Sequence, residues 1–326
     1  MLTARENFLE TLRGGSPDRY VNQYEALSLI MSPIGSYQRI GIGGEGKNHW
    51  GVTIRWPEGT PGAFPVHDDA HKVVKDITCW RDTVHAPATD LPEEAWERAI
   101  AFASRTDRKE KLAAVMIAPG VFETCHYLMG MEDTLINFYE EPEAMHDLVE
   151  FITQYEMRMA EQICARLHPD AVFHHDDWGS HLSSFLAPEM FREFYLEPYQ
   201  RIYGYYKAHG VEVIVHHSDS YAANLVPSMI EMGIDVWQGA VTTNDIPSLL
   251  AQYGSKLTIM GGLNNGILDK VDWTPEAVAE EVERMCRSCG NKYFIPCLTS
   301  GLPGSTYPGV YQCVSENIDR MSKLLF

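Results

Sequence analysis

The sequence predicts an α/β protein whose parallel strands close into a (β/α)8 barrel. Short apolar segments alternate with helical segments from about residue 92 onward, which is the pattern of βαβ units in a parallel sheet. At least six such strands are predicted, and this number favours a closed barrel over an open sheet. The length of 326 residues also exceeds the about 250 that a barrel typically needs. We therefore expect a single barrel domain, residues 1–326, with an elaborated N-terminal region.

The N-terminal region is predicted to begin with a helix and a strand. Thr3-Ala4-Arg5-Glu6 is a capping box, and the amphipathic segment after it stops at Gly14-Gly15. Residues 19–25 are expected to form the first strand. We interpret residues 35–90 as an excursion that forms a lid over the barrel mouth, with a hairpin around residues 50–56. Long loops of this kind are usually functional.

The alternating region supplies the other elements of the barrel. Further strands are expected at residues 112–117, 171–174, 211–215, 235–237, 257–260 and 293–295. Helices are expected at residues 92–104, 131–167, 188–209, 221–232, 246–252, 274–290 and 315–325.

Composition excludes several classes of partner. The chain carries 26 Lys and Arg against 45 Asp and Glu, a net charge of −19. This charge argues against nucleic acid and anionic membranes, because both need a basic patch. The first residues lack the apolar stretch of a signal peptide, and the seven cysteines are scattered along the chain. We therefore expect a cytoplasmic protein with reduced thiols.

Two segments concentrate histidines and aspartates at the ends of predicted strands. The first contains His174, His175, Asp176 and Asp177, and the second contains His216, His217 and Asp219. In α/β folds the carboxyl edge of the sheet is where ligands bind, and buried ionisable groups are costly unless they are paired or bind a metal. We predict an active site here, although some of these histidines could instead cap helices or bind backbone atoms.

Other residues are candidates for substrate or metal binding. Cys297 ends the last predicted strand, where its thiolate could join His216 in binding Zn²⁺; the alternative is a buried, inert cysteine. Residues at predicted strand ends that could orient substrate, and aromatic residues that could wall a pocket, are Asn22, Glu25, Glu123, Trp178 and Tyr307.

Several motifs, in order along the chain, resemble the uroporphyrinogen decarboxylase superfamily. They are Pro17-Asp18-Arg19, Asp176-Asp177-Trp178-Gly179, Ala187-Pro188-Glu189-Met190-Phe191, His216-His217-Ser218-Asp219, Gly261-Gly262-Leu263-Asn264 and Glu316-Asn317-Ile318. The resemblance covers nearly the whole chain and implies a (β/α)8 barrel. It also adds Asn264 to the substrate-binding candidates, together with His174, Asp176 and Trp178.

Within the superfamily the chain most resembles the corrinoid methyltransferases that act on aryl methyl ethers such as veratrol. The arginine cluster of the decarboxylase branch is missing from residues 21–27. The resemblance implies methyl transfer from a small aromatic methyl ether to cobalamin on a separate corrinoid protein, with a homodimer as a further expectation. His175, Asp177, His216, His217 and Asp219 would hold the acid or the metal ion that activates the ether.

One departure concerns the metal. Methanol and methylamine relatives bind zinc through His-x-Cys and a later Cys, which match His216 and Cys297, but the middle position is Ser218. A hydroxyl is a poor zinc ligand beside a thiolate, so either a carboxylate replaces it or the metal is weak or absent; we expect zinc. Alternatives for the function are another methyl donor (methanol, methylamine, betaine or methyl-tetrahydrofolate), a decarboxylase-like lyase, and a non-catalytic binding protein.

Overall fold

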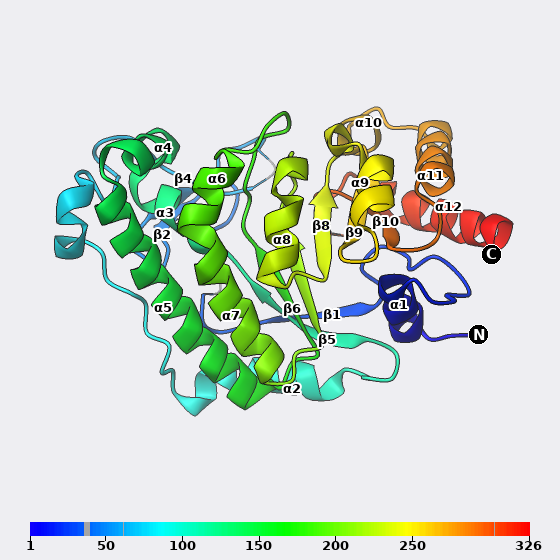
Figure 1. Cartoon of the computed structure of the whole chain (residues 1–326), viewed down its shortest axis with the longest axis horizontal. Coiled ribbons are helices and arrows are strands. Elements are labelled where there is room, and N and C mark those ends of the chain that lie inside the picture. Colours follow the sequence, from blue (N-terminus) through cyan, green and yellow to red (C-terminus); the bar gives the residue numbers. More distant parts are fainter. Residues whose placement is uncertain (36–39, 61, 303) are drawn as a thin grey trace.

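The computed structural model describes residues 1–35, 40–60, 62–302 and 304–326. Seven parallel strands form one curled sheet, with each strand beside the next in chain order (Figure 1). This arrangement confirms the predicted barrel-type fold, with seven parallel strands in the described residues where eight were expected. The strands are β1 (Leu27–Met31), β5 (Leu112–Ile117), β6 (Ala171–His175), β7 (Val213–His217), β8 (Val236–Ala240), β9 (Thr258–Leu263) and β10 (Phe294–Leu298).

The first strand begins later than the sequence predicts. Residues 23–26 form a turn, and Gln23 has a φ of 53°, which is not a strand conformation. The turn is held by side-chain contacts, because Gln23 Nε2 donates to Ser315 Oγ over 2.9 Å. The prediction of a strand at residues 19–25 is therefore wrong, and β1 follows it at Leu27–Met31.

The helices cover the outer face of the sheet, with α5, α7 and α8 in front of it in Figure 1. The main helices are α1 (Ala4–Arg13), α2 (Glu93–Arg105), α3 (Val121–Met129), α4 (Met131–Glu140), α5 (Pro142–Leu167), α6 (Pro188–Phe191), α7 (Glu197–Ala208), α8 (Val226–Met232), α9 (Ile246–Tyr253), α10 (Asn265–Leu268), α11 (Pro275–Cys289) and α12 (Val310–Leu325). The Thr3 capping box is confirmed. Helix α3 was not predicted, and α12 begins five residues earlier than expected.

The sheet separates two apolar layers. Phe173, Val215 and Cys297 belong to the cluster that fills the barrel interior. Val172 and Ile214, their neighbours along the strands, belong to the cluster between the sheet and the helices. Because successive side chains of a strand point to opposite faces, this alternation decides which of the histidines that follow face the barrel axis.

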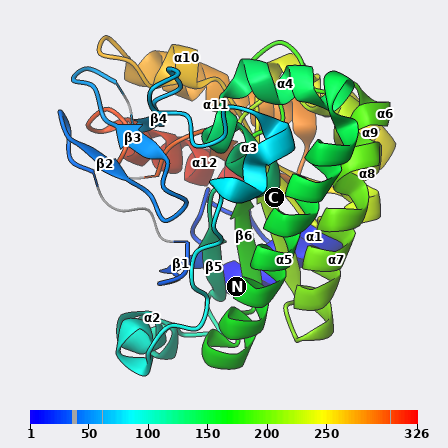
Figure 2. The same ribbon diagram turned by 90° about the vertical axis from the view of Figure 1, so that its left-hand side faces the viewer.

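The N-terminal excursion contains a small antiparallel sheet. Strand β2 (Glu45–Lys47) pairs with β3 (Thr53–Arg55), which pairs with β4 (Phe64–Pro65), so the predicted hairpin is confirmed. Figure 2 shows this sheet beside α3, and the backbone amides of Val73 and Val74 donate to Leu128 O at the end of α3. Residues 36–39 and 61 of the expected lid lie outside the described residues, and the lid role stays a prediction.

In the described part of the chain, no helix combines the length and the apolar character that crossing a membrane requires.

Candidate active site

The two histidine segments lie side by side at the carboxyl edge of the sheet. His174 on β6 is in register with His216 on β7, and His175 is in register with His217. The pairing continues beyond the strands, because Asp176 N donates to His217 O over 3.1 Å. The alternation of the strands then divides the two segments into an inward and an outward set.

The inward set consists of His175, Asp177 and His217. One ligand atom from each lies within 4.8 Å of the others, and this is the group of three in the described residues that could hold a metal ion. The two imidazole rings stack with their centroids 4.4 Å apart. We call these three residues the inner triad.

Each imidazole of the inner triad is held through its Nδ1 atom. His175 Nδ1 lies 2.8 Å from Glu123 Oε2, and His217 Nδ1 contacts Gln238 Oε1. These contacts leave Nε2 of each ring as the nitrogen for a metal ion or a substrate, the arrangement found around metal-binding histidines. Burial lowers the pKa of His217 to about 4. Burial also acts to lower the pKa of His175, but the charges of Glu123 and Asp177 outweigh it and raise the value to about 10.

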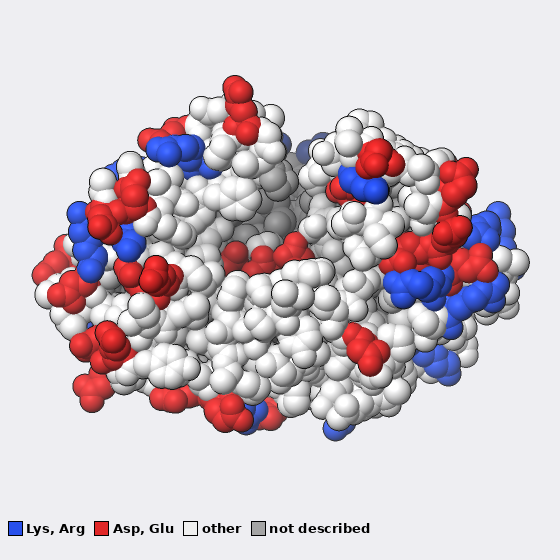
Figure 3. Space-filling model, turned by 90° about the horizontal axis from the view of Figure 1, so that it is seen from above, with Lys and Arg blue, Asp and Glu red and all other residues white. Residues whose placement is uncertain are grey.

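Carboxyl groups crowd this end of the barrel. Asp219 N donates to Asp177 Oδ1 over 3.0 Å, and burial together with the charge of Asp177 raises the pKa of Asp219 to about 8. Burial likewise raises the pKa of Glu123 to about 7, against the opposing effect of His175. Figure 3, which views the carboxyl edge from above, shows a hollow bordered by acidic side chains.

The outward set forms a buried hydrogen-bonded chain behind the sheet. His174 Nε2 lies 3.2 Å from Glu156 Oε2 on α5, and its Nδ1 lies 2.7 Å from Tyr203 Oη on α7. The same hydroxyl lies 2.8 Å from His216 Nδ1, whose Nε2 is 3.1 Å from Asp176 O. Hydrogen bonds engage both ring nitrogens of His216 and Nδ1 of His174. His174 Nε2 has no hydrogen bond and makes the ion-pair contact with Glu156.

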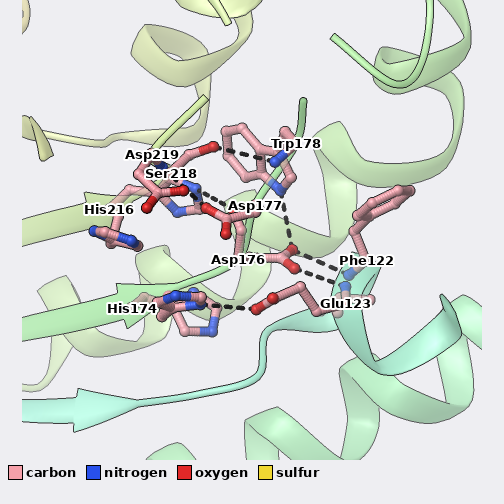
Figure 4. Close-up of polar contacts among 12 residues, drawn as sticks. Phe122, Glu123, His174, Asp176, Asp177, Trp178, His216, Ser218 and Asp219 are labelled. Atoms are coloured by element: carbon pink, nitrogen blue, oxygen red, sulfur yellow. Dashed lines mark hydrogen bonds and ion pairs between the residues drawn. The ribbon is translucent and has the colours of Figure 1, made fainter. Parts of the chain in front are cut away.

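Asp176 anchors the amino end of α3. Its carboxylate accepts from the amides of Phe122 (3.0 Å) and Glu123 (2.7 Å), from Trp178 Nε1 (2.9 Å) and from the hydroxyl of Tyr199 (Figure 4). Gly120 permits this approach, because a Cβ there would come within 2.5 Å of Asp176 Cβ. Trp178 in turn stacks on His216 at 3.8 Å. Asp176 and Trp178 thus support the site from behind instead of facing a substrate.

The predicted zinc pair does not form. Cys297 lies in the barrel interior, where Tyr24 and Gln238 contact its thiol and burial raises its pKa well above the usual range. His216 follows Ile214 on the outer face of the sheet and contacts Tyr203 there. The two residues are on opposite faces of the barrel wall, so they do not share one ion.

The remaining candidates make their hydrogen bonds and ion pairs with residues outside the inner triad. Asn22 Nδ2 donates to Ser315 O and Asp319 Oδ1, each over 2.9 Å, and Glu25 pairs with Arg19. Asn264 follows β9 and caps α10, and Tyr307 is held through its amide by Asp269 at 2.7 Å. Glu123 is the one candidate outside the two histidine segments that contacts the inner triad.

Several residues of the site were missed in the sequence. Gln238 and Glu156 each interrupt an apolar pattern, the first in β8 and the second on the buried face of α5. A lone polar residue in such a pattern is a usable signal, because burial demands a partner. His67 and His126 carry no comparable signal, since they meet only when the excursion packs on α3.

His67 and His126 form a second histidine pair near the site. Their ring centroids are 6.2 Å apart, and His67 Nε2 and His126 Nδ1 are buried without a hydrogen-bond partner. Burial lowers the pKa of both groups, that of His126 to about 3. Both imidazoles are therefore neutral near pH 7.

The low pKa of His126 predicts an acid-sensitive fold. Between pH 6.5 and about 3 the unfolded chain binds a proton that the folded protein does not, so stability falls as the pH drops. Replacing His126 by Leu should make this fall shallower by up to about 1.4 kcal/mol per pH unit. Urea unfolding at pH 7 and pH 5 measures the difference. The exposed His85 provides the matched control, and equal pH dependence in His126→Leu and His85→Leu would contradict the prediction.

The fold and the site together define the class of protein: a parallel barrel with titratable side chains gathered at its carboxyl edge, where such barrels place their active sites. Comparison with protein families makes this specific. The family model "Uroporphyrinogen decarboxylase (URO-D)" matches residues 50–321, and the chain belongs to this family.

Among solved structures, a match that spans nearly the whole chain agrees on the fold. A methyltransferase from Methanosarcina mazei superposes with a TM-score of 0.67 at 11% sequence identity, covering 98% of this chain and 99% of the other. A D-allulose 3-epimerase from Methylomonas sp. matches with a TM-score of 0.37 and 8% identity, covering 72% of this chain and 94% of the other. A comparison with curated proteins finds no match.

Proposed function

We propose that this protein is a corrinoid-dependent methyltransferase that demethylates aryl methyl ethers and passes the methyl group to cob(I)alamin on a separate corrinoid protein. The observation that carries the proposal is the inner triad, His175, Asp177 and His217, at the mouth of the barrel. The family and the likeness in fold to a methyltransferase support it. The resemblance to veratrol-type enzymes motivates the choice of substrate.

The reaction requires a group that stabilises the negative charge that develops on the ether oxygen. Breaking the bond between methyl carbon and ether oxygen leaves a phenolate, whose conjugate acid has a pKa of about 10. Cob(I)alamin is the nucleophile, so the protein has to orient the ether and stabilise the leaving oxygen. His175 and His217, each fixed through Nδ1, present Nε2 for this purpose.

The donor set of the inner triad also fits a zinc ion. Two imidazoles and one carboxylate are common ligands of catalytic zinc, which keeps a further position open. Glu123 and Gln238 would orient the two imidazoles from behind, as outer partners of metal ligands do. A zinc ion held there would act as a Lewis acid on the ether oxygen.

Metal content tests this ligand set separately from activity. We expect about one equivalent of Zn²⁺ per chain after zinc loading and dialysis, as four-coordinate sites with three protein ligands bind one ion. His217→Ala should lose the ion, whereas Cys297→Ser should retain it, because Cys297 is not one of the three residues whose ligand atoms come together. Loss of zinc in Cys297→Ser with retention in His217→Ala would overturn the assignment.

A decarboxylase acting on a polycarboxylate fits the site poorly. Among the described residues, no ion pair joins Lys or Arg to Glu123, Asp177 or Asp219. A polycarboxylate needs cationic partners when it binds in a buried site, and in the described part of the chain no Lys or Arg paired with these carboxyl groups is there to supply them. An aryl methyl ether carries no charge and needs no such partner.

The visible spectrum of a reduced corrinoid protein tests the proposal. We expect guaiacol or veratrole, mixed anaerobically with this protein and the corrinoid protein, to convert the cob(I) spectrum into that of methyl-cob(III)alamin with an equal amount of phenol. Conversion with methanol, an amine or methyl-tetrahydrofolate only would replace the substrate. No conversion with any donor would contradict the methyltransferase assignment and favour a lyase or a binding protein.

A further inference from the structure

We propose that a groove in the N-terminal excursion binds the phosphate group of a small organic molecule through Lys47, His49 and His85. The excursion alone forms this groove, because every described residue that lines it lies between Lys47 and His85. No described lining residue belongs to the inner triad. The inference therefore goes beyond the proposed function and does not depend on it.

The groove has room for a ligand. Its volume is about 490 Å³, within the range of about 300–1,000 Å³ that is typical of sites for small molecules. Trp50 and Val73 line it beside the polar groups, and they offer apolar contact to an organic part of the ligand. Trp50 is fixed from the other side, since its ring meets that of Tyr155 edge to face with centroids 4.9 Å apart.

The groove is lined by side chains that carry or can gain a positive charge. Two lysines and three histidines are among its described lining residues, which include no Asp or Glu. They are Lys47, Lys72, His49, His71 and His85. Such a cluster is unexpected in a chain with a net charge of −19. Because a cleft lined by one sign of charge concentrates ions of the other sign, the groove favours an anion.

Two of these five groups already have acidic partners. Lys72 Nζ lies 2.6 Å from Asp133 Oδ2, and His71 Nδ1 lies 2.5 Å from Asp68 Oδ1. The other three form no ion pair and no side-chain hydrogen bond within the described ranges of the chain, and they are Lys47, His49 and His85. These three are the groups that remain for a ligand.

Thr53 adds a hydroxyl group to the groove. Thr53 is 6% exposed and lines the groove, and its side chain makes no hydrogen bond to another described residue. Its hydroxyl oxygen is nevertheless accessible to water, unlike the unpaired nitrogens of His67 and His126. Since a buried hydroxyl normally has a partner, a ligand in the groove would supply one.

These donors are fixed before any ligand binds. Lys47 and Thr53 are directly opposite each other in the β2–β3 pair, and the Cβ atoms of such residues are about 4.5–5.5 Å apart on one face. His49 lies in the turn between the two strands. Asn48 holds this turn, because its Oδ1 accepts from the amide of Trp50 over 2.9 Å. Donors that are ordered in advance lose less entropy on binding.

The arrangement suits a polyatomic anion better than a metal ion. Among the described residues, the inner triad is the group of three whose ligand atoms come within 4.8 Å of one another, so the three histidines of the groove do not meet around one ion. A phosphate group has several oxygens and can accept from donors that are further apart. Ammonium, imidazole N–H and hydroxyl groups all donate to oxygen, and lysine is a frequent phosphate ligand.

Calorimetry with phenyl phosphate tests this inference. This probe joins a phosphate group to an apolar ring, and phenol and inorganic phosphate each supply one of the two parts. We expect phenyl phosphate to bind more tightly than either. Equal affinity for inorganic phosphate would overturn the organic part of the ligand and identify free phosphate as its source. No binding of phenyl phosphate or inorganic phosphate by the unmodified protein would overturn the whole inference.

Substitutions then locate the binding site. Lys47→Gln should weaken the binding of phenyl phosphate about tenfold, the value of one hydrogen bond to a charged group, and His85→Ala should weaken it as well. Both residues are exposed, so neither change threatens the fold. Lys75→Gln is the matched control, because Lys75 is an exposed lysine of the same excursion that does not line the groove.

Two further comparisons make the result specific. Equal weakening in Lys47→Gln and Lys75→Gln would mean that only the net charge matters, and it would overturn the assignment to the groove. His217→Ala should bind phenyl phosphate like the unmodified protein, and a loss of binding there would place the ligand at the inner triad instead. None of these measurements uses a corrinoid protein, so their outcomes leave the proposed function untouched.

Discussion

Asp177→Asn is expected to lower the rate of methyl transfer by roughly 10²- to 10⁴-fold, the usual contribution of an acid–base group, while leaving the protein folded. Asp177 is the carboxylate of the inner triad, within 4.8 Å of the ligand atoms of His175 and His217. Asp219 N donates to Asp177 Oδ1 over 3.0 Å, and the amide that replaces the carboxylate has nearly the same shape and can still accept this hydrogen bond. What it loses is the charge that a metal ion or a protonated imidazole needs nearby.

The rate is measured from the appearance of methyl-cob(III)alamin in the presence of an excess of corrinoid protein. Asp82→Asn is the matched control, because Asp82 is exposed in the excursion, and we expect it to behave like the unmodified protein. A near-normal rate in Asp177→Asn would remove Asp177 from the reaction. A low rate accompanied by a lower unfolding midpoint would mean that the substitution acts on the fold instead.

The barrel and the edge that carries the site could be predicted from the sequence. The regular alternation of apolar strands and helices determines a parallel sheet, and the carboxyl ends of its strands meet at one edge. The two histidine segments end neighbouring strands, so their meeting followed from the fold. The register of His175 with His217 shows how closely they approach.

Which histidines face inward could not be predicted. Val213, Ile214 and Val215 are all apolar, because a parallel strand is buried on both faces, and an unbroken apolar run gives no phase for the alternation. The phase is set by partners on other elements: Tyr203 and Trp178 hold His216 behind the sheet, whereas Gln238 holds His217 inside. This one-residue difference separates the inner triad from the expected zinc pair.

Contacts between distant segments also could not be predicted from the sequence. Glu123 reaches His175 from a helix that periodicity did not predict, 52 residues earlier in the chain. His67 meets His126 only because residues 73 and 74 bind the end of α3. Such pairs depend on how loops pack, and composition and periodicity carry no information about that.

Asp176 is where we expect the largest loss of stability. Asp176→Ala should lower the free energy of unfolding by at least about 3 kcal/mol, because each buried donor left unpaired costs about 1–3 kcal/mol. Four donors are affected: the amides of Phe122 and Glu123, the indole of Trp178 and the hydroxyl of Tyr199. Burial of the charge offsets part of the stabilisation by these hydrogen bonds, and it raises the pKa of Asp176 to about 6. With four donors, we still expect the carboxylate to stabilise the folded protein more than an alanine at this position.

A graded series distinguishes this explanation from a simple cavity effect. Tyr199→Phe removes one donor to the carboxylate and the acceptor of the Val121 amide, so it should cost about 1–2 kcal/mol. Asp176→Asn keeps the volume but loses one acceptor oxygen and the charge, and should fall between Tyr199→Phe and Asp176→Ala in urea unfolding. If Asp176→Asn is as stable as the unmodified protein, volume alone matters at this position. Asp176 stands between His175 and Asp177 in the chain, and its carboxylate connects the end of β6 to the start of α3. The same series should therefore lower the rate of methyl transfer in the same order.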